Sequence, residues 1–232
     1  MWMMTQTWQD VLFLHWPIAP QELEKHVPQE LKLDLFEQNA WISAVLFKVY
    51  RHRLRFLPPL PGMNTYLQLN VRTYVEYNGM KGIYFFHLDV TNYFLSKITA
   101  IGSLPYRHSN ILVKQRGDHY SYTSHYKVSD ERLRVTCTIG DKTNTNFDQW
   151  IVERYHSWAK WKDTLFRIDI HHSPWELKRA TVTIQSNTLA SFMKGSFQGM
   201  QPRAHYAKNK VARVFPPAVE RKMDINASRF LH

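Results

Sequence analysis

Polar side chains recur at every second position in the segment LQLNVRTYVEY, residues 67–77. Because side chains alternate between the two faces of a β-strand, Gln68, Asn70, Arg72 and Tyr74 fall together on one face. All four form hydrogen bonds, and the planar guanidinium of arginine suits a carboxylate through two parallel hydrogen bonds. The pattern fits either a solvent-exposed sheet face or the polar lining of an internal chamber.

A second strand with polar residues, IYFFHLDV at residues 83–90, follows the turn sequence NGMKG. Asn and Gly in that turn favour the positive φ of a β-hairpin. A four-residue loop at residues 78–81 places Arg72 opposite His87 and Asn70 opposite Asp89. This register predicts one shared polar face, because a slip of one residue would move these groups among the apolar side chains.

Arg72 is the main candidate for ligand binding on this face. Inside a chamber its charge requires an acidic partner, because an isolated buried charge is costly. Asp89 is the partner that the register favours, and Glu153 in a later predicted helix is the alternative. Replacing Arg72 with Met would then leave a buried carboxylate unpaired, at a cost of about 3–5 kcal/mol.

Three further functional groups, Tyr106, Arg107 and His108, follow a proline in the segment SLPYRHSN at residues 103–110. A tyrosine hydroxyl can donate a hydrogen bond or act as an acid, so Tyr106 is a candidate partner of Arg72. Considered alone, the segment is typical of a loop between two strands.

The composition argues against several classes of site. A single cysteine, Cys137, excludes an internal disulfide framework and a Cys-rich zinc site, and its phase in LRVTCTIG places it in the core. His171 and His172 are adjacent, so in a strand they point to opposite faces and do not converge on a metal. GxSxG, P-loop, GxGxxG and HExxH motifs are absent from the sequence, and we expect neither a metal nor a cofactor.

The net charge of +11 is dispersed, apart from basic groups at residues 51–55 and 203–222. Neither group matches a nucleic-acid-binding motif, so we interpret both as solvated charge. The first residues lack the pattern of a signal peptide, and the apolar runs are far shorter than the roughly 20 residues of a membrane helix. These features and the single cysteine favour a cytoplasmic protein without a specific nucleic-acid or membrane partner.

Alternating and aromatic-rich segments predict many strands and few helices, which indicates an α+β, mainly antiparallel fold. Strands are expected at residues 41–50, 67–77, 83–90, 110–114, 119–128, 132–139, 167–171 and 180–185. A short helix is expected at residues 20–26, and a proline-rich loop at residues 51–63.

A longer helix is expected at residues 146–161, because aromatic residues there recur at spacings of three and four. Asn146 is the expected N-cap, and Trp150, Tyr155 and Trp158 would pack this helix against the sheet.

Five motifs occur in an order and spacing that resemble a known family: LNVRTYV, IYFFHLDV, SLPYRHSN, VERY and HHSPWEL. Together they resemble the YqjF-like bacterial family of domain of unknown function 2071, in the acetoacetate decarboxylase-like superfamily. The resemblance covers about residues 15–217 of an expected single domain, residues 1–232. It implies a cone-like antiparallel β-barrel, wrapped by additional strands and a few helices, that holds a ligand inside.

The resemblance also implies a departure from decarboxylase chemistry. Acetoacetate decarboxylases form a Schiff base on one lysine, and a neighbouring lysine lowers its pKa. Those two positions match Tyr106 and Arg107 here, and neither phenol nor guanidinium can form the Schiff base. Gln68 stands where relatives commonly carry Glu. Lysine-dependent decarboxylation is therefore not expected.

The sequence thus favours a barrel pocket for a small carbonyl or carboxylate compound, with lyase-like or isomerase-like chemistry if the protein is an enzyme. A non-catalytic ligand-binding or interaction protein is the alternative, and a homo-oligomer is left open. The candidate catalytic residues are Tyr106, Arg72, Asp89 and Glu153. The candidate ligand-binding residues are Gln68, Asn70, Arg72, Tyr74, His87, Arg107 and His108.

Reductive trapping tests the expected loss of lysine chemistry. Incubation with a keto acid and sodium borohydride is expected to leave the intact mass unchanged, because the matching positions carry no amine. A lysine-dependent aldolase treated in parallel provides the positive control. A stoichiometric lysine adduct in the mass spectrum would contradict the interpretation of Tyr106 and Arg107.

Overall fold

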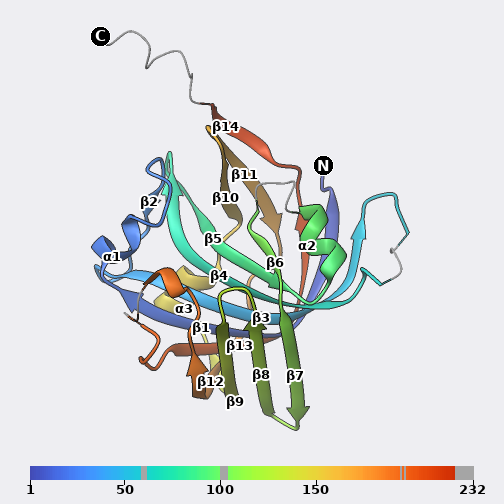
Figure 1. The fold of residues 1–232 in the computed structure, drawn as a ribbon, viewed down its shortest axis with the longest axis vertical. Coiled ribbons are helices and arrows are strands. Elements are labelled where there is room, and N and C mark those ends of the chain that lie inside the picture. The colour runs from blue at the N-terminus through green and yellow to red at the C-terminus, as the bar shows by residue number, and fades with distance from the viewer. Residues whose placement is uncertain (59–61, 100–103, 194, 196, 223–232) are drawn as a thin grey trace.

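The structure is a computed structural model that describes residues 1–58, 62–99, 104–193, 195 and 197–222 (Figure 1). Strands predominate in these ranges, accompanied by short helices. In chain order the elements are β1 (Met4–Ile18), α1 (Pro20–Glu24), β2 (Lys32–Leu33), β3 (Ala40–Leu54), β4 (Tyr66–Tyr77), β5 (Met80–Val90), α2 (Tyr93–Thr99), β6 (Tyr106–His108), β7 (Asn110–Arg116), β8 (His119–Tyr126), β9 (Glu131–Thr143), α3 (Asn146–Val152), β10 (His156–Trp161), β11 (Thr164–His171), β12 (Leu177–Asn187), the 3-10 helix η1 (Ser191–Met193), β13 (Arg203–Val214) and β14 (Ala218–Lys222).

A closed β-barrel forms the centre of the molecule. Its strands pair in the order β13, β1, β3, β4, β5, β10 and β11. β11 then pairs with β13, through Ile170 with Val214 and His171 with Arg213, so that the sheet closes on itself. The pairings are antiparallel except that β5 and β10 run parallel. The predicted mainly antiparallel α+β fold is confirmed.

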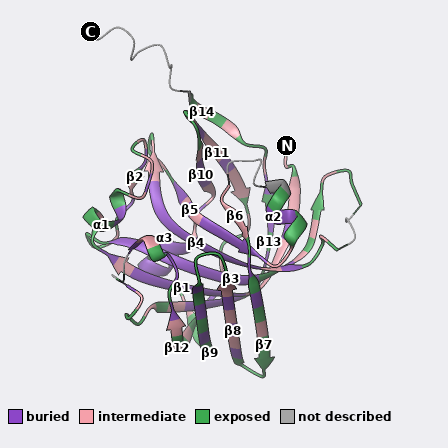
Figure 2. Ribbon diagram, viewed as in Figure 1, coloured by how far each residue is buried: buried purple, intermediate pink, exposed green. Residues whose placement is uncertain are grey.

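Strands β12, β9, β8 and β7 continue the sheet beyond β13 and cover part of the outer wall of the barrel (Figure 1). In β9, Leu133, Val135 and Cys137 are buried, whereas the residues between them are exposed. The buried row belongs to the same hydrophobic cluster as Leu12 and Leu14 on the outer face of β1. β1, β3 and β4 are therefore buried on both faces along most of their length (Figure 2).

The turn between β4 and β5 is shorter than the sequence reasoning predicted, and its predicted register is wrong. Asn78 and Gly79 form a two-residue turn, both with positive φ, and Tyr77 pairs with Met80. This conformation suits the twist of a hairpin, which explains why two residues suffice. Arg72 consequently lies opposite Phe85 and not opposite His87.

A β-bulge further along the hairpin changes the phase of β5. Val71 pairs with His87 while the next residue, Arg72, pairs with Phe85, so Phe86 is the extra residue. Beyond the bulge, Asn70 lies opposite Leu88, and Asp89 lies opposite Leu69. His87 and Asp89 therefore share the outer face with Leu69 and Val71, and the predicted common face with Asn70 and Arg72 is wrong.

The predicted helix at residues 146–161 is also too long. α3 ends at Val152, and residues 156–161 form the strand β10, which pairs with β11 and β5. The N-cap is Thr145, not Asn146: its hydroxyl accepts from the Asp148 N–H in a capping box. Trp158 thus packs from a strand, because cross-strand pairing overrides an ambiguous aromatic spacing.

The remaining helices and strands differ less from their predicted boundaries. β3 extends to Leu54 and shortens the predicted proline-rich loop, of which residues 59–61 lie outside the described part. α1 is shorter than predicted, and the remaining expected strands are present with shifted ends. In the described ranges, no helix is long and apolar enough to span a bilayer.

Trp158 provides a test of the β10 placement. Its side chain is fully buried beside Tyr77, and replacing it with Ala is expected to destabilise the protein by about 3–5 kcal/mol in urea unfolding. Trp161 in the same strand is 54% exposed, so its replacement with Ala is the matched control, expected below about 0.5 kcal/mol. Equal losses for the two variants would contradict this strand.

Candidate functional site: a polar cavity inside the barrel

The barrel contains a partly open cavity of about 90 Å³. Its walls are mainly apolar side chains from the inner faces of β1, β3 and β5, such as Phe13, Val45 and Phe85. β4 contributes the polar residues Gln68, Asn70 and Arg72, which the alternation of this strand directs inward. The polar face of residues 67–77 therefore lines a cavity and is not a solvent-exposed face.

Arg72 is buried in this cavity with its guanidinium close to the rings of Phe13 and Tyr74, at 5.9 and 5.7 Å from their centroids. Within the described ranges no carboxylate forms an ion pair with it, and its Nε has no hydrogen-bond partner. The expected ion pair with Asp89 or Glu153 is therefore wrong. Asp89 points away on the outer face of β5, and both oxygens of Glu153 are engaged elsewhere.

Arg154 adds a second guanidinium to the cavity wall. Its Nη1 donates to Asp34 Oδ2 at 2.6 Å, but its Nε and Nη2 are buried without hydrogen-bond partners. Burial lowers the pKa of Arg154 despite the opposing effect of Asp34. Two guanidinium groups line the cavity, and among the described residues only that of Arg154 has an acidic partner, so the electrostatic character of the cavity is positive.

Tyr74 lies on the same face of β4 as Arg72, but its side chain packs beneath the residues that line the cavity. Its hydroxyl and Ser43 Oγ are 2.7 Å apart, and Ser43 Oγ is 2.7 Å from His15 Nδ1. All three residues are completely buried, and burial lowers the pKa of His15 well below its usual value. This network fixes the floor beneath Arg72 and Arg154, both of which lie over the Tyr74 ring.

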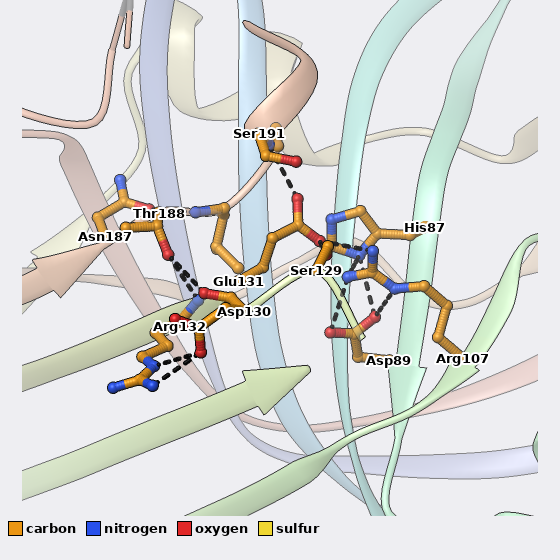
Figure 3. A network of polar contacts seen from close by, with 12 residues as sticks. His87, Asp89, Arg107, Ser129, Asp130, Glu131, Arg132, Asn187, Thr188 and Ser191 are labelled. Carbon is orange, nitrogen blue, oxygen red and sulfur yellow. Dashed lines mark hydrogen bonds and ion pairs between the residues drawn. The ribbon is translucent and has the colours of Figure 1, made fainter. Parts of the chain in front are cut away.

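His87, Asp89 and Arg107 form a separate polar cluster outside the barrel (Figure 3). Arg107 donates to both oxygens of Asp89, at 2.7 and 3.1 Å, and to Glu131 Oε2 at 2.6 Å. Its Nη2 also lies 2.9 Å from His87 Nδ1, and the same ring nitrogen lies 3.1 Å from Asp89 Oδ1. The cluster joins β5, β6 and β9, so its position indicates a structural role.

The charges of this cluster stabilise one another. Burial alone would raise the pKa of Asp89, but the hydrogen bonds and charges of His87 and Arg107 outweigh it and lower that pKa. The pKa of Glu131 is likewise lowered, by the Ser191 N–H and Arg107 against the effect of burial. Both carboxylates therefore stay ionised at neutral pH.

Tyr106 and Arg107 are adjacent in β6 and point to opposite sides of it. Tyr106 lines the barrel cavity, whereas Arg107 belongs to the outer cluster. Desolvation raises the pKa of Tyr106 to about 12, so its hydroxyl is a proton donor at neutral pH. His108 is exposed, with its ring 5.5 Å from that of Tyr93, and does not line the cavity.

His172 lines the cavity as well, and the sequence reasoning did not select it as a site residue. Its Nδ1 donates to the Ser173 carbonyl at 2.9 Å, which leaves Nε2 as an acceptor. Burial is the main cause that lowers its pKa, so the ring is neutral at pH 7. The feature of the sequence that could have indicated His172 is its aromatic context, HHSPWEL. Trp175 in this segment also lines the cavity and stacks on Trp8, with ring centroids 6.0 Å apart.

The barrel is similar in fold to acetoacetate decarboxylase-like enzymes. One from Sphingomonas wittichii RW1 superposes with a TM-score of 0.71 at 10% identity, over 95% of this chain and 94% of that chain. The enduracididine biosynthesis enzyme MppR, complexed with pyruvate, also superposes with a TM-score of 0.71 at 10% identity, over 93% of this chain and 90% of that chain. At such low identities the likeness extends to the fold alone.

Sequence relationship is closer with uncharacterized bacterial proteins. Residues 5–210 match the family described as an uncharacterized conserved protein, domain of unknown function 2071, and the chain belongs to that family. The uncharacterized protein YqjF of Bacillus subtilis (strain 168) is 35% identical over 225 residues, covering 93% of this chain and 91% of that protein. The resemblance found in the five motifs is thereby confirmed.

The outer cluster predicts a specific loss of stability. Replacing Arg107 with Met leaves Asp89 buried without its cation and is expected to cost about 3–5 kcal/mol at pH 7. Because the folded-state pKa values of Asp89 and Glu131 are lowered, the contribution of the pairs is complete above the unfolded-state values near 4 and is lost as pH falls through the folded-state values. The difference between wild type and variant should therefore shrink below about pH 4.

Urea unfolding followed from pH 7 to pH 3 measures this effect. Arg132→Met is the matched control, because the Arg132–Asp130 pair is exposed and solvent screening leaves it little effect on stability. If Arg107→Met costs no more than the control at pH 7, the outer cluster does not hold the strands together.

Proposed function

We propose that the barrel cavity binds a small carboxylate, such as a short 2-oxo acid, and that Arg72 is its anion-binding residue. The observation that carries this proposal is the buried guanidinium of Arg72, which forms no ion pair within the described ranges. A buried charge without a partner is costly, and a bound carboxylate would compensate it.

The neighbouring groups support the same class of ligand. Arg154 presents unpartnered guanidinium nitrogens, which are hydrogen-bond donors suited to a carboxylate. A cavity of about 90 Å³ is smaller than the roughly 150 Å³ that hold a benzene molecule, so the ligand has only a few non-hydrogen atoms. The pyruvate in the MppR complex, which shares this fold, is a compound of this size and charge.

If the protein is an enzyme, we propose proton transfer at the carbon next to the carbonyl, in a lyase-like or isomerase-like reaction. His172 Nε2 is a neutral base on the cavity wall, and the Tyr106 hydroxyl is a donor toward the carbonyl oxygen. Arg72 would hold the carboxylate and favour the enolate electrostatically. No lysine lines the cavity in the described part of the chain, so the proposed chemistry does not use a Schiff base.

Asp89, Glu153, His87, Arg107 and His108 have no part in this proposal, because none of them lines the cavity. The alternative is binding without catalysis, in a cytoplasmic protein that senses or carries the acid. Exchange of the pyruvate methyl protons in D₂O, followed by NMR, separates the two. Exchange that depends on His172 supports the enzyme, and its absence together with binding supports the carrier.

Arg72→Met tests the anion site. The variant removes a cation that forms no ion pair in the described structure, so we expect its stability without ligand to be unchanged or higher, the reverse of the sequence-based expectation. Pyruvate should raise the melting temperature of the wild type, since a ligand specific to the folded state stabilises it by mass action, and should not raise that of the variant.

Arg134→Met provides the matched control, because Arg134 is an exposed arginine on β9. It should keep the full ligand-dependent shift. A shift that persists in Arg72→Met would reject Arg72 as the anion-binding residue, and a lower stability of the unliganded variant would reveal an acidic partner.

A further inference from the structure

Large exposed apolar side chains gather at one end of the barrel, on three segments. Phe56, which is 85% exposed, and Leu57 follow the end of β3, and Phe94, which is 70% exposed, lies in α2 beside Tyr93. Met3 just before β1 is exposed too. Scattered single apolar residues on a surface are normal, but a contiguous group marks an interaction site.

Hydrogen bonds and a cation–π contact join the three segments into one surface, which we call the aromatic-basic rim. The Arg55 N–H donates to the Met3 carbonyl at 2.8 Å, and the Arg55 guanidinium lies 4.6 Å from the Trp2 ring centroid. Asn92 Nδ2 donates to the Gly62 carbonyl at 2.7 Å, which links the start of α2 to the loop after β3. Figure 1 shows α2 near the N-terminus. The rim consists of Trp2, Met3, Arg51, Arg53, Arg55, Phe56, Leu57, Tyr93, Phe94 and Lys97.

All the charged side chains of the rim are basic. The sequence carries no Asp or Glu between Glu37 and Glu76, or between Asp89 and Asp118, and the first acid of the chain is Asp10. Arg51, Arg53 and Lys97 are exposed, so their charges are available to a partner. The basic group at residues 51–55, which the sequence reasoning treated as solvated charge, is thus placed beside protruding aromatic rings.

Phe56 also has an unfavourable backbone conformation. Its φ is +66°, in the left-handed region that bulky residues avoid. A strained residue usually gains compensation from packing or from function. Phe56 is 85% exposed and its ring centroid lies 4.9 Å from the Arg55 guanidinium, so burial in the core does not account for the strain.

We propose that the aromatic-basic rim docks on the surface of an anionic lipid bilayer. The aromatic and aliphatic tips would enter the interface between headgroups and acyl chains, and the arginines and lysine would bind lipid phosphates. A second copy of the chain fits poorly, because it would bring like charges together. An acidic protein partner would require a matching hollow for Phe56 and Phe94, whereas a bilayer accepts side chains that protrude from separate segments.

Docking would bring the membrane close to one end of the barrel cavity. His52, between two rim arginines, has its Nδ1 3.2 Å from Gln6 Nε2, and Gln6 lines the cavity. The membrane proposal does not depend on the identity of the cavity ligand. It places the function of the chain at a membrane surface and not only in an aqueous compartment.

Co-sedimentation of the full chain with vesicles tests the proposal. Vesicles with 40 mol% phosphatidylglycerol in phosphatidylcholine should bind the protein, pure phosphatidylcholine should bind it at least about tenfold less, and binding should weaken as NaCl rises from about 50 to 500 mM. Phe56→Asn and Phe94→Ser together should reduce binding at least about tenfold, and so should Arg53→Glu with Lys97→Glu. Asn tolerates positive φ, so Phe56→Asn adds no strain.

Two controls match these variants. Val128→Ser changes an apolar residue that is 84% exposed on the β8–β9 connection, and Arg134→Glu changes an exposed cation on β9; both should bind vesicles like the wild type. Circular dichroism and melting curves should show that all variants are folded. Absence of wild-type binding, or equal losses in rim and control variants, would overturn the proposal. So would a rim-dependent dimer seen by light scattering without vesicle binding, which would identify a second copy as the partner.

Discussion

Closure of the barrel by the pairing of β11 with β13 is the constraint on which the rest of the structure depends. Once the sheet is closed and β12, β9, β8 and β7 cover its outer wall, β4 has no face left for bulk water. Each polar side chain of β4 must then form its hydrogen bonds or ion pairs inside the protein or with a bound ligand. Tyr74 finds Ser43, whereas Arg72 pairs with no acid in the described part of the structure.

The two arginines near β5 show how the same side chain serves two purposes. Arg107 donates hydrogen bonds to Asp89 and Glu131, lies 2.9 Å from His87 Nδ1, and joins three strands. Arg72 contacts aromatic rings, which accept a cation without consuming its hydrogen-bond donors. A fully paired guanidinium stabilises the fold, and one whose donors remain free is suited to recognise an anion.

Much of the fold followed from local patterns. The period-2 alternation of residues 67–77 identified β4 and its polar face, and the five motifs identified the family. The predictions that failed concern pairings between strands that are distant in the sequence. The bulge at Phe86 leaves no recognisable mark in IYFFHLDV, and the aromatic spacing of residues 146–161 suits a helix until β5 and β11 are available to pair with His156–Trp161. Arg154 and His172 were missed as site residues for the same reason, since barrel closure alone brings them to the cavity.

The bulge at Phe86 also decides which side chains of β5 face the cavity. With uninterrupted alternation from Ile83 and Phe85, His87 and Asp89 would point into the barrel, where a carboxylate would neutralise Arg72 and compete with any acidic ligand. One inserted residue between Phe86 and Asp89 would have the same effect. The positive electrostatic character of the cavity therefore depends on the length of this strand as well as on its side chains.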